Sequence, residues 1–192
     1  MGYLRMALDY WRHPHKVMQE QVDKNTYRYP MMLVLIAGIS DFAGTMQSES
    51  FGEDLSLSTL LILLVLVGPV VGYISFMIGS WITDLVAGLF KGERNLRGFR
   101  MAFSWAHLII WLQVLLAFIF ISISGADYFT TEFDNAVYFS IDSVIGVVYF
   151  VYYLITVKFF YQFSIWKSLL VVLFPLIIVT LILLLIGLLI FL

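Results

Sequence analysis

The sequence predicts an all-α integral membrane protein with five transmembrane helices, the N-terminus inside the cell and the C-terminus outside. Composition is the first observation: 61% of the 192 residues are hydrophobic and only 12% are charged. Soluble domains are nearer to half apolar and about a quarter charged. The second observation is a set of long apolar runs, and the third is the distribution of Lys and Arg. A soluble domain is therefore excluded.

Five apolar segments provide the predicted spans. They are residues 30–46, 57–90, 101–123, 137–157 and 168–192. A transmembrane helix needs about 20 residues, so the first segment is short and the second is long. The second segment contains Gly68-Pro69, where it could divide into two crossings. The distribution of charge decides between one crossing and two.

All eleven Lys and Arg residues fall on one side of the membrane if each segment crosses it once. They lie in residues 1–29, 91–100 and 158–167, whereas loops 47–56 and 124–136 carry only acidic charges. The positive-inside rule makes the basic side cytoplasmic. An additional crossing at Gly68-Pro69 would place the basic loop and the N-terminus on opposite faces. We therefore expect one long second helix, tilted or kinked at Pro69.

Residues 1–29 are expected to form a cytoplasmic or interfacial segment, and residues 30–192 the five-span membrane domain. The pattern in residues 2–12 is typical of a short interfacial helix, which Pro14 would end. Its apolar face comprises Tyr3, Leu4, Ala7, Leu8 and Trp11. A helix packed on the protein's own loops is the alternative. No signal-peptide pattern opens the sequence, so we expect a multi-pass protein of the cytoplasmic membrane.

Ionisable residues inside predicted spans are costly and are the first candidates for function. Asp84 precedes the inner end of the second span, and His107 follows the inner start of the third, each at a depth of about 9 Å. Because a short loop joins these helices, an Asp84–His107 pair is one prediction. The alternatives are a static interhelical hydrogen bond, or an Asp84 carboxylate that reaches the arginines below it.

Two further carboxylates, Asp41 and Asp142, lie near the outer ends of the first and fourth spans. They are candidates for an outward-facing polar cavity that admits a cation or a basic peptide. The alternative is that they cap helix ends or reach external water. In the second span, Gly68, Pro69 and Gly72 form a GxxxG pattern that allows close helix packing, either within the fold or between copies.

Loop 91–100 carries four cations between two apolar segments: Lys91, Arg94, Arg97 and Arg100. The loop is too short for nucleic acid, and anionic headgroups or an acidic surface of a partner suit it better. His13 and His15 flank Pro14 without a further ligand nearby, and the sequence has no cysteine and no catalytic motif. We therefore expect no enzymatic activity, no cofactor and no metal site.

A series of short motifs follows a recognisable order along the chain. Its members are Trp11-Arg12-His13-Pro14, Gly68-Pro69-Val70-Val71-Gly72, Leu89-Phe90-Lys91-Gly92, Phe99-Arg100-Met101-Ala102-Phe103-Ser104, and Phe163-Ser164-Ile165-Trp166-Lys167-Ser168 before a last span with Pro175. In this order the chain resembles the Yip (Ypt-interacting protein) domain family, in its bacterial branch. The family's five-span arrangement, N-terminus in and C-terminus out, coincides with the topology derived from charge.

The resemblance implies little chemistry. Where the family usually has a small residue and then proline, this chain has Ala106-His107, so a role for His107 cannot be carried over. The resemblance implies instead a non-enzymatic accessory or scaffold protein that assists the assembly or regulation of another membrane complex, such as an ABC-type exporter. It leaves open whether the chain also forms a homo-oligomer.

Two other functions remain open at this stage. One is a small transporter or channel for an ion, a proton or a peptide, with Asp84 and His107 at its inner gate and Asp41 and Asp142 at its mouth. The other is lipid organisation by the N-terminal helix and the basic loop on anionic headgroups.

Overall fold

The computed structural model describes residues 3–191, without the side chains of residues 3, 4, 179, 181–183 and 185–191. Within this part of the chain all regular structure is helical, which confirms the predicted all-α class. The elements are α1 (Tyr3–Tyr10), α2 (Pro14–Lys24), α3 (Arg28–Ser48), α4 (Phe51–Asp54), α5 (Leu57–Leu89), α6 (Leu96–Phe103), η1 (Ser104–Ala106), α7 (His107–Ser124), η2 (Gly125–Phe129), α8 (Ala136–Phe160) and α9 (Ile165–Phe191).

Four helical segments of the described residues are long and apolar enough to cross a membrane: Arg28–Ser48, Leu57–Leu89, Leu96–Phe129 and Ala136–Phe160. They correspond to the first four predicted spans. At the start of α9, the described apolar stretch Ile165–Ile178 is shorter than a span. The predicted fifth span, 168–192, lies partly outside the described residues, so the total of five stays a prediction.

The third span is assembled from several helical pieces. A 3₁₀ turn, η1, separates α6 from α7, and the Ser104 hydroxyl donates to the Met101 carbonyl at 3.0 Å there. Such a turn tightens the helix for one step. The turn covers Ser104–Ala106, so the third span departs from regular α-helix there without a proline.

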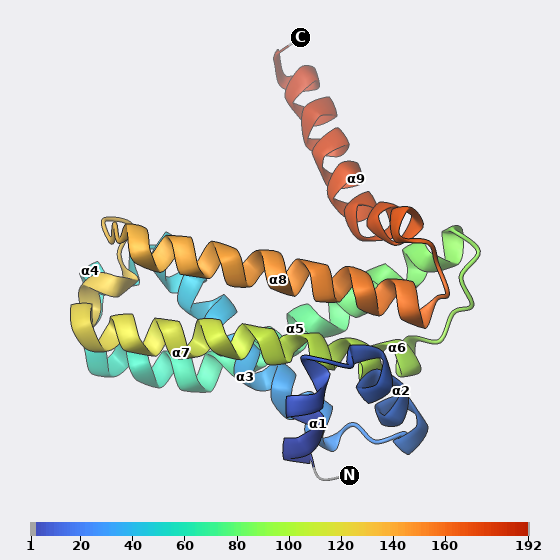
Figure 1. Cartoon of the computed structure of the whole chain (residues 1–192). Coiled ribbons are helices and arrows are strands. Elements are labelled where there is room, and N and C mark those ends of the chain that lie inside the picture. Colours follow the sequence, from blue (N-terminus) through green and yellow to red (C-terminus); the bar gives the residue numbers. More distant parts are fainter. Residues whose placement is uncertain (1–2, 192) are drawn as a thin grey trace.

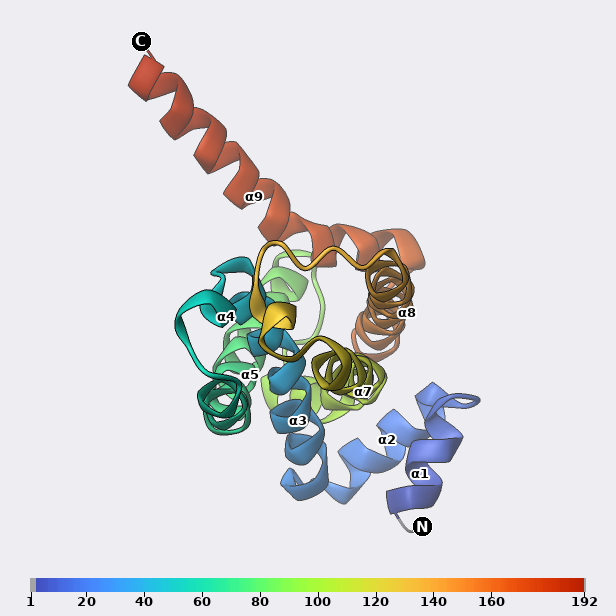
Figure 2. The same ribbon diagram turned by 90° about the vertical axis from the view of Figure 1, so that its left-hand side faces the viewer.

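The long helices form a bundle in which each helix contacts only some of the others (Figure 1). α3 packs against α5 and α7, and α7 packs against α8. The first part of α9 then crosses from α8 to α5, and its later part projects away from the bundle (Figure 2). The connection between α3 and α5 and the connection between α7 and α8 meet at one end of the bundle, through α4 and η2.

Glycines of α3 and α5 allow the backbones of these two helices to pack closely. A Cβ atom added at Gly72 would lie 2.4 Å from the Cα atom of Gly38, and one added at Gly68 would lie 2.9 Å from the Cα atom of Ile39. Both distances are well below the optimum of about 3.5–4.0 Å between carbon atoms. The GxxxG pattern of α5 is therefore used inside one chain, and Pro69 lies between its glycines in a helix that continues across it.

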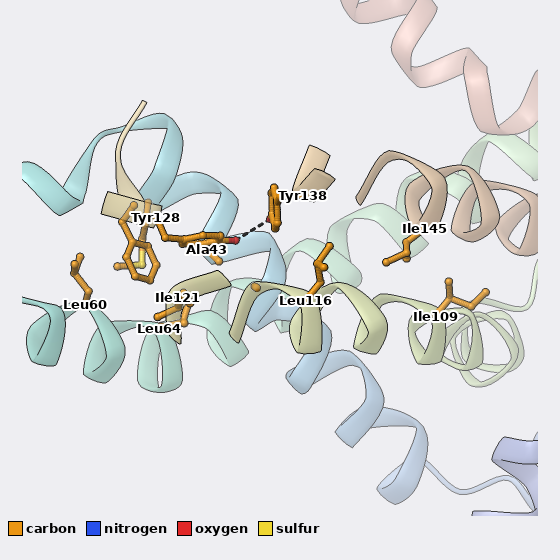
Figure 3. Packing of buried hydrophobic residues seen from close by; sticks show 12 residues of the cluster. Ala43, Leu60, Leu64, Ile109, Leu116, Ile121, Tyr128, Tyr138 and Ile145 are labelled. Atoms are coloured by element: carbon orange, nitrogen blue, oxygen red, sulfur yellow. Dashed lines mark hydrogen bonds between the residues drawn. The ribbon is translucent and has the colours of Figure 1, made fainter. Parts of the chain in front are cut away.

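An apolar cluster fills the end of the bundle near α4 and η2 (Figure 3). Leu60 and Leu64 of α5 are fully buried there, as are Tyr128 and Phe129 of η2. The Tyr128 and Tyr138 hydroxyls lie 2.8 Å apart, so each of these buried polar groups has a partner. This hydrogen bond joins η2 to the start of α8 and thereby fixes the connection between the third and fourth spans.

The N-terminal segment forms two helices instead of the single one predicted. α1 ends at Tyr10, and Pro14 begins α2, where a proline at the first helical position costs no hydrogen bond. Met6 and Tyr10 are fully buried in a cluster with Trp105, whereas Leu8 is 66% exposed. The segment is thus packed on the protein itself, which was the alternative reading of this region, while Leu8 keeps an exposed apolar position.

Candidate functional site

Asp84 lies in the last two turns of α5 and is almost fully buried. Its carboxylate accepts three hydrogen bonds: from Arg94 Nε at 3.1 Å, from the Asn95 backbone N–H at 3.2 Å and from the Tyr161 hydroxyl at 2.9 Å. Hydrogen bonds to a buried carboxylate are strong because they offset the loss of its hydration. Asp84 therefore joins the C-terminal end of α5 to two connections, 90–95 and 161–164.

The hydroxyl of Tyr161 serves this arrangement as a donor. Burial, followed by the hydrogen bond to Asp84, raises the pKa of Tyr161 above its ordinary value. The phenol therefore keeps its proton throughout the physiological pH range and donates a hydrogen bond to the carboxylate. Arg94, whose side chain is 51% exposed, adds a positive charge at the edge of the same group.

The four cations of the basic loop have different surroundings. Arg100 points back along α5, donating from Nε to Ser80 Oγ at 2.9 Å and from Nη2 to the Met77 carbonyl at 3.0 Å. The guanidinium of Arg97 lies 5.7 Å from the centre of the Tyr27 ring. Lys91 and Arg97 are exposed, so these two cations remain accessible, while Arg94 and Arg100 also hold the loop against α5.

His107, the first residue of α7, lies deep in the bundle and is 7% exposed. Its Nδ1 atom is 3.3 Å from the Phe103 carbonyl, and its Nε2 atom is 3.5 Å from the Tyr149 hydroxyl. A carbonyl can only accept, so in the neutral ring Nδ1 donates and Nε2 is left to accept. The structure therefore does not pair His107 with Asp84; instead, the Asp84 carboxylate is bonded to Arg94 of the basic loop.

A cavity of about 250 Å³ lies beside His107, in the middle of the bundle. Residues from α3, α5, α6, α7 and α8 line it. Its polar lining consists of Asp41, Ser75, His107, Tyr149 and Tyr153. The Tyr153 hydroxyl is hydrogen bonded to Thr83 of α5, which connects α5 and α8 across the bundle. The cavity thus joins one predicted outer carboxylate, Asp41, to the predicted inner histidine.

Asp142 does not belong to the lining of this cavity. Its carboxylate accepts a hydrogen bond from Gln113 Nε2 at 2.8 Å, between α7 and α8. Asp41, by contrast, has no hydrogen-bond or ion-pair partner among the residues that the structure describes. The two outer carboxylates that the sequence grouped together therefore have different surroundings: one is paired, and the other is exposed at a polar cavity.

Sequence reasoning missed several members of these sites. Tyr161 lay within an aromatic-rich stretch, 159–166, whose composition gave no sign that one hydroxyl reaches a carboxylate 77 residues earlier. A polar cavity was expected at Asp41, but its other lining residues were missed because helix neighbours are not readable from hydropathy. The spacing of Tyr149 and Tyr153 by four residues does place both on one face of α8, which is the signal available in the sequence.

Among the described residues, no group of three or more His, Cys, Asp or Glu side chains is placed to hold a metal ion. Comparison with known proteins gives one family match, to the Yip1 domain, which covers residues 8–187. No curated protein and no solved structure shows significant similarity to the chain.

Proposed function

The chain belongs to the Yip1 domain family, and on that basis we propose that it is a non-enzymatic scaffold that packs laterally against another membrane protein and assists its assembly or regulation. Family membership together with the four apolar helices gives it a membrane-associated role. The partner that the family resemblance implies is an ABC-type exporter.

The proposed topology has five spans in the cytoplasmic membrane, with α9 as the fifth, the N-terminus in the cytoplasm and the C-terminus outside, and α5 kinked at Pro69. The arrangement of charge supports it. The basic loop between α5 and α6 lies at one end of the bundle with α2 and the connection between α8 and α9. Acidic residues of α4 and η2 lie at the other end. This separation follows the positive-inside rule.

The observation that carries the scaffold proposal is the outer face of α5. Apolar residues at four-residue spacing form one exposed stripe along this helix: Ile62, Leu66, Val70, Ile74 and Ile78. A second four-residue series, from Leu60 through Gly72 to Ser80, is buried against the bundle and lies opposite the exposed residues at each level of the helix. A continuous apolar stripe of this length faces either lipid or another transmembrane helix, and a scaffold requires such a surface.

Site-specific photocrosslinking tests the scaffold proposal. A photoreactive amino acid at Val70 is expected to form an adduct with one membrane protein in intact cells, identified by mass spectrometry. The same group at Val147, an exposed valine on α8, is the matched control and should yield lipid adducts. Lipid adducts alone at both positions, with a chain that emerges alone from mild detergent, would contradict the proposal. An adduct with a protein other than an exporter would contradict only the proposal that the partner is an exporter.

A second candidate, a small transporter or channel, is favoured by one observation: residues of all four candidate spans line the cavity beside His107, and several of them are polar. Asp84 is no longer suited to an inner gate, because its carboxylate is occupied by Arg94, Asn95 and Tyr161. The test is substrate flux into vesicles that contain the purified chain. Flux that is lost in His107→Ala would support transport, and a complete lack of flux would exclude it.

A further inference from the structure

The cavity beside His107 is lined by an unpaired carboxylate, that of Asp41, inside a candidate span, where a charged group is energetically unfavourable. Asp41 is residue 14 of the 21 in α3, inside a candidate span, and its side chain is exposed at the cavity. A charged side chain at this depth normally pairs with an opposite charge or with hydrogen-bond donors. Among the described residues it has neither. A ligand that brings positive charge would satisfy it.

The lining of the cavity excludes an internal counter-ion. No Lys or Arg is among the residues that line it. His107 is the basic side chain present, and both of its ring nitrogens already lie near partners, the Phe103 carbonyl and the Tyr149 hydroxyl. A positive charge that pairs with the ionised Asp41 carboxylate would therefore come from outside the cavity.

The remaining polar atoms favour a ligand that donates hydrogen bonds. Ser75, Tyr149 and Tyr153 contribute hydroxyl oxygens, which accept as well as donate. A primary ammonium group has three donors and a positive charge, which matches one carboxylate and several hydroxyl oxygens. A quaternary ammonium carries the same charge but no donor. The polar lining therefore distinguishes between these two kinds of cation.

The size of the cavity limits the ligand further. Its volume of about 250 Å³ is below the range of about 300–1,000 Å³ that is usual for drug-sized ligands. Apolar and aromatic side chains, including Phe76, Phe103 and Ile110, make up the rest of the lining. A compact group with a short alkyl portion fits such a site, whereas a peptide does not.

We propose that the cavity between α3, α5, α7 and α8 binds a compact primary ammonium group, with the Asp41 carboxylate as its counter-ion and Ser75 at its mouth. The group belongs either to a free amine or to the ethanolamine headgroup of a lipid that enters from the bilayer. Ser75 and Asp41 are both exposed, so the cavity opens to the outside of the bundle beside these two side chains. This inference is independent of the scaffold proposal, which rests on the outer face of α5.

Binding to the purified full chain in nanodiscs tests the inference. In phosphatidylcholine nanodiscs, ethylammonium is expected to bind saturably by calorimetry. In Asp41→Asn, which keeps the shape of the side chain and removes its charge, the affinity should fall at least tenfold. Asp142→Asn is the matched control, because Asp142 is outside the cavity and is paired with Gln113, and its affinity should stay within twofold of the original.

Two further measurements complete the test. Tetramethylammonium should bind the unaltered chain at least tenfold more weakly than ethylammonium, a comparison that needs no variant to fold. If the ligand is a lipid headgroup, phosphatidylethanolamine should co-purify with the unaltered chain and be depleted in Asp41→Asn. The proposal is overturned if neither ethylammonium nor phosphatidylethanolamine depends on Asp41, or if tetramethylammonium binds as well as ethylammonium.

Discussion

Replacing Gly72 by alanine tests whether the contact between α3 and α5 sets the spacing of the bundle. The new Cβ atom would lie 2.4 Å from the Cα atom of Gly38 and 2.9 Å from its backbone nitrogen. Neither neighbour is a flexible side chain, so the clash cannot be relieved by a rotamer change. The two helices must separate by about 1–1.5 Å to restore an ordinary carbon–carbon contact.

The cost of this separation is estimated from overpacking in protein cores. Forcing additional carbon into a packed site costs about 1–3 kcal/mol, and more where backbone must move. The loss is expected at the upper end of this range, because α3 also packs on α7 and a shift of α3 disturbs both contacts. The same reasoning applies to Gly38→Ala, whose Cβ atom would lie 2.4 Å from the Gly68 carbonyl oxygen.

The free energy of unfolding, measured by denaturation in mixed detergent micelles, is the appropriate readout. Gly79→Ala is the matched control, because this glycine lies on the same helix and an added Cβ atom meets nothing within 4 Å. Its effect should be neutral or slightly stabilising, since alanine favours a helix by up to about 1 kcal/mol over glycine. Equal destabilisation at positions 72 and 79 would refute the reasoning.

Two other predictions concern the inner end and the topology. Tyr161→Phe removes the hydroxyl that donates to Asp84 and should destabilise the chain by about 1.5–3 kcal/mol in the same denaturation assay. The control is Tyr73→Phe, at an exposed tyrosine, which should leave the free energy of unfolding unchanged. Equal losses in the two variants would contradict the role of the hydrogen bond. Because the sequence has no cysteine, Arg97→Cys and Glu132→Cys are single labelling sites. An impermeant thiol reagent applied to intact cells should label only position 132, and labelling of position 97 would reverse the proposed orientation.

The sequence was sufficient to predict the class of fold and the first four spans, because length and hydropathy are properties of each segment alone. It also indicated that Gly68 and Gly72 allow close packing, but the partner, Gly38, depends on which helices are neighbours. The N-terminal region was predicted less well. Most residues of α2 are polar, so the sequence pattern does not predict that Val17 and Met18 are buried. Their burial depends on the packing of α2 against α6 and α8.

Residue counts predict the depth of Asp84 and of His107, but they do not predict the partners of these side chains. Equal depth on adjacent helices does not determine the direction in which each side chain points around its helix. Asp84 faces the loop and Tyr161, whereas His107 faces Tyr149 and the cavity. Asp41 was predicted near the outer end of its span, and nothing in the sequence indicates that it shares a cavity with His107.

The carboxylate of Asp84 also has a consequence for the order of events during biosynthesis. Arg94 follows it by 10 residues and Tyr161 by 77. At the usual rate of translation these two partners are made about 0.5–2 s and about 4–15 s after Asp84. The newly inserted α5 thus obtains its arginine almost at once, while its tyrosine arrives only with the end of α8. Throughout this interval the Asp84 carboxylate lacks the Tyr161 hydroxyl. The nascent chain therefore depends on Arg94 to pair this carboxylate before the bundle is complete.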